Sequence, residues 1–454
     1  MANETQHLSH KPLSVKRIAV WKLFGSYSYN LPSPDDPSRD ISNFFILYGD
    51  NGSGKTTILR LVFHLLGHED DKGHRTFLAQ TRFSKFLVEL ENGITISAER
   101  PSGMLVGSYM LRVSDSSREI AACQVTADEN NIVRTNVNQM SVLREFLAHL
   151  RNLKVAVYYL SDDRKITGGW FYAPVEEDEF LTTLRASRSR HAEALHARRL
   201  EQSRAVQELE IERVIHGAEE WIRQQVYRGS RVGQEGANTI YANVISRIAG
   251  LRNEKKAEAK STRDSLASTL KTLIDRNNEF CHFGITAPMK PDEFLSPLRR
   301  VNESKLEIIS DVLAPYSRGL ETRLDALQEI KNLISIFLDN INSFFTDKQI
   351  TYQLREGIRI ISSSKEILQP RFLSSGERQL LLLFCTVVSA RSAKGIFIID
   401  EPELSLNVKW QRRLLKSLLE CIQGSSIQFV LATHSLELIS QYRNSVVKLE
   451  SSRD

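Results

Sequence analysis

A glycine-rich segment near the N-terminus has the residue types and spacing of a phosphate-binding loop. It reads GDNGSGKTT and consists of Gly49, Asp50, Asn51, Gly52, Ser53, Gly54, Lys55, Thr56 and Thr57. Glycines allow backbone N–H groups to turn inward around a phosphate, and the helix that follows adds positive potential. We expect Lys55 to contact the β- and γ-phosphates of a nucleotide, Thr56 to coordinate Mg²⁺ and Thr57 to help hold the phosphates. The alternative is a chance glycine-rich turn, but every position of the motif is filled.

A pair of acidic residues follows an apolar run in the segment GIFIIDEPE. Residues 396–399 predict a buried strand that delivers Asp400 and Glu401 at its carboxyl end, where open α/β sheets bind ligands. Asp400 fits a partner of Mg²⁺ through water, and Glu401 fits the group that orients or deprotonates an attacking water. An acidic turn before Pro402 is the alternative, but a phosphate loop in the same chain favours the catalytic interpretation.

Two further segments could serve the same site. The segment FVLATHS is another apolar strand, and it ends at His434. A single histidine at a strand end is more often structural, but the order of the motifs favours a functional one. The segment LSSGERQLLLLF, residues 373–384, begins an almost wholly apolar helix with residues suited to hold an anion. A core helix with a serine cap would explain the same residues.

The elements around these motifs predict an α/β fold with a mixed, largely parallel sheet, because buried apolar strands alternate with helices. Alternating runs around Asn92 and Gly93 predict a hairpin. The middle of the chain has long helical patterns rich in Ala, Leu, Glu and Arg. We therefore expect an N-terminal lobe over residues 1–180, an inserted helical domain over 181–345 and a C-terminal lobe over 346–454.

Composition narrows the function classes. The chain has 454 residues, 41% hydrophobic and 25% charged, as in soluble globular proteins. Its longest apolar run, residues 380–390, is too short to span a bilayer, and no secretory signal is visible, so we expect a cytoplasmic protein without a membrane partner. The four cysteines lack ligand spacing and predict reduced thiols. A net charge of +5 permits contact with nucleic acid without arguing for it.

The order of the motifs resembles that of ABC-type ATPases of the SMC/RecF class. The residues that resemble the family's signature motif are Leu373, Ser374, Ser375, Gly376 and Glu377, with Glu377 where transporters usually carry Gln. The segment PELSL after Glu401 resembles the corresponding segment of overcoming-lysogenization-defect and RecF-like ATPases, with Asn407 where a His commonly follows. The resemblance covers roughly residues 15–165 and 346–450 and does not reach the helical middle.

This resemblance implies an ABC-type ATPase head with ATP and Mg²⁺ as cofactors and with Glu401 and His434 as catalytic residues. In the family, the phosphate loop of one protomer holds ATP and the signature of a second protomer caps the γ-phosphate. Ser374 and the backbone of Gly376 would make that contact. The resemblance therefore implies an ATP-dependent head-to-tail dimer or a larger homo-oligomer.

Several assignments stay open. The glutamine that reaches Mg²⁺ in the family has three candidates, which are Gln80, Gln124 and Gln139. Arg164 could approach the nucleotide or form a surface ion pair. Phe24 or Tyr27 could pack on adenine. Six arginines between Arg185 and Arg204 could face DNA or another nucleic acid, and a solvated helix face explains them equally well.

The overall plan also resembles the ATPase subunits of bacterial anti-phage defence systems, such as PtuA of Septu and retron systems and AriA of PARIS. In those systems the ATPase senses infection and controls a separate nuclease or toxin effector. The chain ends at Asp454 without a predicted nuclease domain, so we expect any nuclease to be a partner. A RecF/SMC-like ATPase of DNA repair or recombination and a nucleotide-locked scaffold with little turnover are the alternatives.

Overall fold

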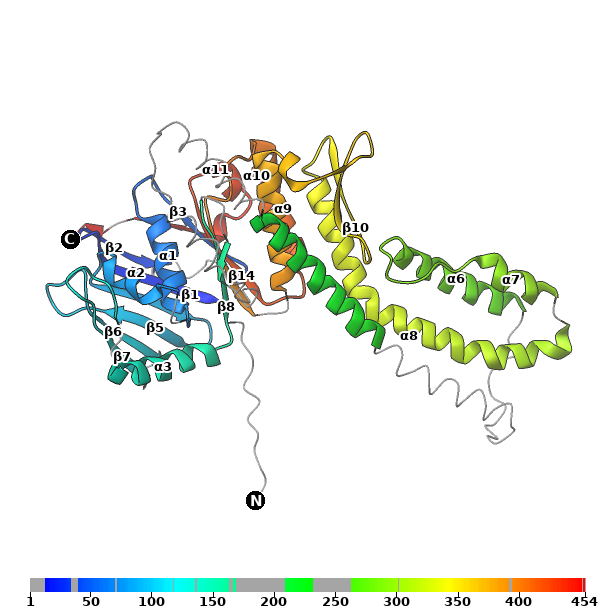
Figure 1. Ribbon diagram of the computed structural model, residues 1–454, viewed down its shortest axis with the longest axis horizontal. Helices are drawn as coiled ribbons and strands as arrows, with labels where there is room; N and C mark the ends of the chain where they lie inside the picture. Colours follow the sequence, from blue (N-terminus) through cyan, green and yellow to red (C-terminus); the bar gives the residue numbers. More distant parts are fainter. Residues whose placement is uncertain are drawn as a thin grey trace, which may run out of the picture. The chain divides into compact units, whose positions relative to one another are not determined.

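The computed structural model forms two compact units, and each is described by itself. The structure describes residues 13–33, 40–69, 72–116, 118–134, 137–162, 166–168, 209–231, 263–300, 302–391, 394–450 and 452–453. The first unit is Met1–Glu210 with Ala390–Asp454, and the second is Ile211–Ser389. The second unit therefore includes residues 346–389 together with described helices of the middle region (Figure 1). The predicted division into three domains remains a prediction.

A largely parallel sheet lies at the centre of the first unit, as expected from the apolar strands. Its strand order is β15-β3-β14-β13-β8-β9, and only β9 runs antiparallel to its neighbour. The strands are β3 (Phe44–Tyr48), β8 (Ala156–Leu160), β9 (Ile166–Gly168), β13 (Gly395–Asp400), β14 (Ile427–Thr433) and β15 (Val446–Lys448). Strands from before residue 169 and from after residue 394 thus belong to one sheet, which confirms the predicted α/β class.

Helices follow the strands that carry the motifs. Helix α1 (Lys55–Leu66) follows β3, α10 (Val408–Ile422) follows β13, and the short α11 (Leu436–Ile439) follows β14. In the sheet, Asp400 pairs with Ala432 and Thr433 pairs with Tyr48. Because these strands are parallel and in register, their carboxyl ends meet at one edge of the sheet. The phosphate loop, Asp400 and His434 all lie at this edge.

A second sheet of the first unit is antiparallel and was predicted only in part. Its order is β16-β2-β1-β4-β5-β6-β7. The strands are β1 (Val15–Leu23), β2 (Tyr27–Leu31), β4 (Lys85–Leu90), β5 (Ile94–Glu99), β6 (Tyr109–Asp115), β7 (Arg118–Val125) and β16 (Ser452–Arg453). The predicted hairpin is β4–β5, with Gly93 at φ +88° in its turn.

One apolar core joins these layers. Helix α1 contacts β8, β13 and β14 of the parallel sheet and also β5 of the antiparallel sheet. Alternate residues of the parallel strands, such as Phe45, Ile398 and Val430, are fully buried in the same cluster as Ile58 and Ile96. Helices α2 (His74–Gln80) and α3 (Val137–Asn152) complete the described helices that precede β8. Helix α1 is therefore held from both sides, which makes its N-terminus a rigid base for the phosphate loop.

The second unit combines helices with a small sheet. Its elements are most of a helix whose described part is 209–231, then α6 (Arg263–Cys281), α7 (Pro291–Arg300), α8 (Glu303–Asn342), β10 (Lys348–Gln353), β11 (Gly357–Ser362), β12 (Ile367–Leu368), the 3₁₀ turn η1 (Pro370–Phe372) and α9 (Ser375–Ala390). Strands β10 and β11 pair antiparallel. Among the described helices of either unit, none has the length and apolar character to cross a membrane.

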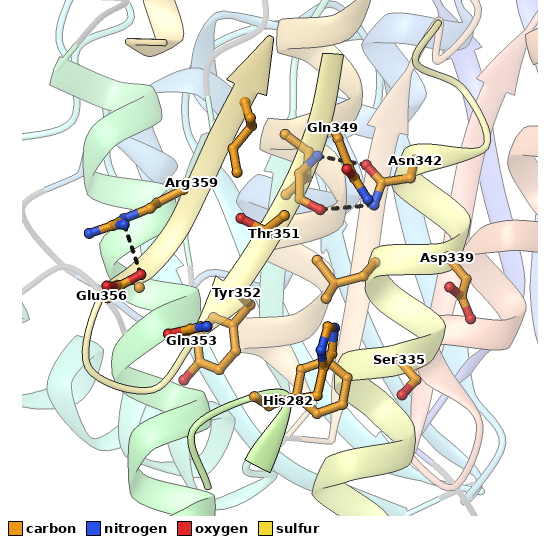
Figure 2. A pocket seen from close by; sticks show the side chains of 15 residues that line it. His282, Ser335, Asp339, Asn342, Gln349, Thr351, Tyr352, Gln353, Glu356 and Arg359 are labelled. Carbon is orange, nitrogen blue, oxygen red and sulfur yellow. Dashed lines mark hydrogen bonds and ion pairs between the residues drawn. The ribbon is translucent and has the colours of Figure 1, made fainter. Parts of the chain in front are cut away.

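A cavity of about 480 Å³ lies in the second unit beside the edge strand β10 (Figure 2). The Asn342 side chain closes part of that edge, because it accepts the N–H of Ile350 at 2.6 Å and donates to its carbonyl at 2.8 Å. Glu356 and Arg359 form an ion pair of 2.8 Å on the same hairpin. None of the site residues predicted from the sequence lines this cavity.

Candidate nucleotide-binding site

The phosphate loop has the backbone conformation that its glycines predict. It connects β3 to α1, with Gly52 at φ +82° and Gly54 at φ +91°. A Cβ atom on Gly54 would lie 2.8 Å from Leu23 Cδ2, so both the conformation and the space exclude a side chain there. Gly54 is also the N-cap of α1, which has no side-chain cap. The helix N-terminus is left available for an anion.

The Lys55 ammonium is folded over the loop. Its Nζ donates to the carbonyls of Gly49 at 2.8 Å and Asp50 at 3.1 Å, and the residue is only 6% exposed. A buried ammonium must keep hydrogen-bond acceptors. Phosphate oxygens would supply stronger, charged acceptors at the same place. Lys55 therefore fits the predicted contact with a bound nucleotide.

Thr56 and Asp400 lie together although they are 344 positions apart in the chain. Thr56 Oγ1 donates to Asp400 Oδ1 at 3.2 Å, and the Tyr159 hydroxyl donates to Asp400 Oδ2 at 3.4 Å. Asp400 is 2% exposed, and burial raises its pKa while the Thr56 and Tyr159 hydrogen bonds oppose the shift. A hydroxyl and a carboxylate are the oxygen ligands that Mg²⁺ prefers. These two residues fit the predicted magnesium position.

Glu401 and His434 form a close pair at the ends of neighbouring strands. Glu401 Oε2 lies 2.6 Å from His434 Nδ1. The Glu401 backbone has φ +48°, and its N–H donates to the Ala432 carbonyl at 2.9 Å, which helps hold this unusual conformation. Strained backbone of this kind concentrates at functional sites. The structure thus brings together the two residues predicted to be catalytic.

The surroundings of Glu401 suit a general base. Burial, and after it the neighbouring Glu403 carboxylate, raise its pKa to about 7, and the contact with His434 opposes the shift. A base works best when its pKa lies near the working pH. Sequence reasoning did not single out Glu403 or Tyr159. Glu403 stands two residues after Glu401, and Tyr159 ends a buried run, but neither position carries a functional signal by itself.

The predicted signature begins helix α9 in the second unit. Ser374 Oγ accepts the N–H of Glu377 at 3.3 Å, and Glu377 Oε2 accepts the N–H of Ser374 at 2.7 Å. This reciprocal pair is a capping box. Lys348 on β10 donates to both carboxylate oxygens, at 3.0 and 3.1 Å. Ser374 and Ser375 are exposed, whereas Leu373 and Gly376 are buried. The serine cap considered above is therefore present, and the Ser374 side chain remains exposed.

Glu377 explains why an acid, rather than Gln, is useful at this position. Burial opposes its ionisation, but hydrogen bonds from Ser374 and Lys348 outweigh burial and lower its pKa. The carboxylate is 8% exposed and satisfies both the helix start and the ammonium. It therefore holds the start of α9, and Ser374 lies directly before this helix.

Removing this carboxylate should destabilise the second unit. We expect Glu377→Ala to lower the free energy of unfolding by about 1–3 kcal/mol, because the Ser374 N–H and the Lys348 ammonium lose their acceptor. Chemical denaturation of the full chain measures the effect. Glu366→Ala, at an exposed carboxylate, is the control and should change stability by less than about 0.5 kcal/mol. Equal stability of the two variants would contradict the anchoring role of Glu377.

The structure describes some of the residues whose roles the sequence left open, among them the two candidates for packing on adenine. Phe24 is 41% exposed, and a Cβ on Gly54 would lie 3.3 Å from its Cε2, so this exposed ring stands beside the phosphate loop. Tyr27 is partly buried and stacks on Tyr29 with ring centroids 6.1 Å apart. Gln80 and Gln124 are exposed at the end of α2 and on β7. The side chain of Gln139, Arg164 and the stripe of residues 185–204 lie outside the described residues, so these predictions stay open.

Comparison with known proteins gives one family match. Residues 283–440 match a family described as "AAA domain, putative AbiEii toxin, Type IV TA system". The match covers less than half of the chain. It includes the predicted signature, Asp400, Glu401 and His434 but not the phosphate loop. No curated protein matches the chain.

Similar solved structures include two archaeal Smc head domains. One is the Smc head domain of Pyrococcus furiosus with an extended coiled coil, bound to the C-terminal domain of ScpA, with 11% identity, a TM-score of 0.36, and coverage of 98% of this chain and 97% of that one. The other is the Smc head domain of Pyrococcus yayanosii with a coiled coil and joint, with 14% identity, a TM-score of 0.37, and coverage of 98% and 96%. In the first unit, the phosphate loop, Asp400 and His434 lie at one edge of a largely parallel sheet, next to the helices that follow β3, β13 and β14.

Proposed function

We propose that this chain binds ATP with Mg²⁺ at the phosphate loop and hydrolyses it. The contact between Thr56 Oγ1 and Asp400 Oδ1, at 3.2 Å, carries the proposal, because it joins a phosphate loop to a buried carboxylate at the sheet edge. Lys55 binds the β- and γ-phosphates. Thr56 and Asp400 would hold Mg²⁺, directly or through water, and the ion would supply positive charge to offset the charge that develops on the phosphates. Glu401 takes a proton from the attacking water, and His434 orients Glu401 and the γ-phosphate region.

We also propose that the chain acts as a homo-oligomer with shared sites. Ser374 of one copy would dock on the γ-phosphate bound to the phosphate loop of another. The exposed position of Ser374 on a rigid helix start supports this arrangement. ATP would then be part of the interface, and its hydrolysis would release the copies from each other.

The biological role that fits best is anti-phage defence, in which this ATPase controls a separate nuclease or toxin effector. The description of the matched family, which names a putative AbiEii toxin of a type IV toxin–antitoxin system, supports a defence setting. A RecF/SMC-like role in DNA repair is the alternative. The basic residues 185–204 that would favour it lie outside the described part of the chain.

Mixing two inactive variants tests hydrolysis and the shared site together. We expect Lys55→Ala and Ser374→Arg each to lack steady-state ATPase activity and their mixture to regain part of it. A mixed dimer pairs the normal phosphate loop of the Ser374→Arg protomer with the normal signature of the Lys55→Ala protomer. Subunit exchange must be confirmed in the same sample, and the Ser374→Arg protomer alone should still bind ATP.

Three outcomes would count against these proposals. A wild-type chain that binds ATP without turnover, with and without its partner, would instead be a nucleotide-locked scaffold. Loss of ATP binding by the isolated Ser374→Arg protomer, with an unchanged melting temperature, would place the signature at its own chain's nucleotide. An exchanged mixture that stays inactive would contradict a shared site able to turn over alone.

A further inference from the structure

Glu403 is a buried carboxylate that holds the turn carrying His434. The residue is 5% exposed. Its Oε1 atom accepts hydrogen bonds from the Thr433 hydroxyl and from the backbone N–H groups of His434 and Ser435, the last two at 3.1 Å each. The three donors are Thr433, the last residue of β14, and the two residues that follow it. One oxygen of Glu403 therefore binds this turn at three consecutive residues.

The same residue belongs to the segment that carries Glu401. Two tight backbone turns start at Glu401 and at Glu403. Leu404 N–H donates to the Glu401 carbonyl at 3.1 Å, and Leu406 N–H donates to the Glu403 carbonyl at 2.9 Å. Gln411 adds a second link, since it donates to the Leu406 carbonyl at 2.9 Å and accepts from the Ser435 hydroxyl at 2.7 Å. Glu403 thus ties the segment after β13 to the segment after β14.

This tie fixes the distance between the two residues assigned to catalysis. Glu401 Oε2 and His434 Nδ1 are 2.6 Å apart, and each sits directly on one of the two tied segments. Burying a carboxylate costs free energy of folding unless hydrogen-bond donors surround it. The three donors at Glu403 Oε1 offset this cost.

We propose that Glu403 is a positioning residue for ATP hydrolysis, which holds His434 against Glu401 in the arrangement that supports turnover. The inference rests on the proposed hydrolysis at Glu401. Glu403 acts through His434, whose Nδ1 lies 3.5 Å from Glu403 Oε1. A displacement of about 1 Å in a catalytic group can cost about 100-fold in rate, so a tie of this kind has a measurable effect.

Two variants of Glu403 and one control test the inference in the full chain. Glu403→Ala removes the acceptor and should lower kcat by about 100-fold while KM for ATP changes by less than about 3-fold. Glu403→Gln keeps an acceptor oxygen and should retain kcat within about 10-fold of wild type. Glu437→Gln, which disturbs only an exposed ion pair with Arg412, should leave kcat unchanged. A kcat of Glu403→Ala equal to that of the control would overturn the proposal.

A double-variant cycle separates positioning from general support of the fold. In a His434→Ala background, Glu403→Ala should lower kcat by less than about 2-fold, because the residue that it positions is gone. Equal effects of Glu403→Ala with and without His434 would overturn the proposal. If Glu403→Ala does not fold, Thr433→Val decides, since it removes one buried donor with little change of shape and should lower kcat by about 3–10-fold. A Thr433→Val variant with wild-type kcat would then contradict the inference.

The outcome also distinguishes this inference from the proposed function. Absence of ATPase activity in the wild-type chain, with intact folding and ATP present in excess, would refute hydrolysis itself. Wild-type activity that survives in Glu403→Ala would refute only the role of Glu403.

Discussion

Replacing Lys55 by alanine is expected to weaken ATP binding by about 100-fold or more. The Lys55 ammonium is the buried cation of the phosphate loop and already hydrogen-bonds the carbonyls of Gly49 and Asp50. Each charge-assisted hydrogen bond to a phosphate contributes about 1.5–3 kcal/mol, and two such bonds exceed a factor of 100 in affinity. Isothermal titration calorimetry with ATP and Mg²⁺ measures the loss directly.

Two controls make the Lys55 result specific. Lys16→Ala removes another cation of the same unit, an exposed one that is ion-paired with Glu89 at 2.7 Å, and should leave ATP affinity unchanged. Lys55→Arg keeps the charge but changes its shape, and should bind ATP more weakly than wild type. An unchanged affinity in Lys55→Ala, with a melting temperature like that of wild type, would remove the nucleotide from this loop.

Glu401→Gln should bind ATP normally and hydrolyse it about 10²–10⁴-fold more slowly. Glutamine has nearly the same shape and can still contact His434 Nδ1, but it cannot accept the proton of the attacking water. The raised pKa of Glu401, about 7, is a property of a group poised to take that proton near neutral pH. Steady-state release of phosphate and a separate measurement of ATP affinity distinguish lost chemistry from lost binding.

The same variant tests the link between ATP and assembly. If ATP is held between two copies, the slow Glu401→Gln protein should accumulate as a dimer in the presence of ATP, which sedimentation velocity would detect. Asn407→Gln, on the same segment but acting through its side chain as the N-cap of α10, should not trap a dimer. Turnover at the wild-type rate in Glu401→Gln would assign the base to another residue.

The motifs at the strand ends could be predicted from the sequence because each depends on a short stretch of chain. Gly52 and Gly54 adopt left-handed backbone conformations that the glycine spacing of the loop predicts. The apolar run before Asp400 and the one before His434 are fully buried strands, as expected of a parallel sheet covered on both faces. The hairpin at Gly93 likewise follows from two neighbouring residues.

Parts of the antiparallel sheet could not be predicted from local sequence patterns. Strand β7 is mostly exposed and lacks a clear alternation, and β16 has two residues, so neither has a local pattern strong enough to predict it. Strand β1 could be predicted as a strand, but its pairing with β2 and β4 depends on which segments the fold brings beside it.

The sequence by itself determined the chemistry that each short segment offers: a phosphate loop, a buried acid, a histidine at a strand end and a serine-capped helix. Only the tertiary structure decided which of these groups meet. Thr56 contacts Asp400, and the Glu403 carboxylate binds the turn at His434, because β3, β14 and β13 are neighbours in one parallel sheet with matched ends. Such contacts depend on strand order and register, which are set by the packing of the whole core and which no local pattern of residues encodes.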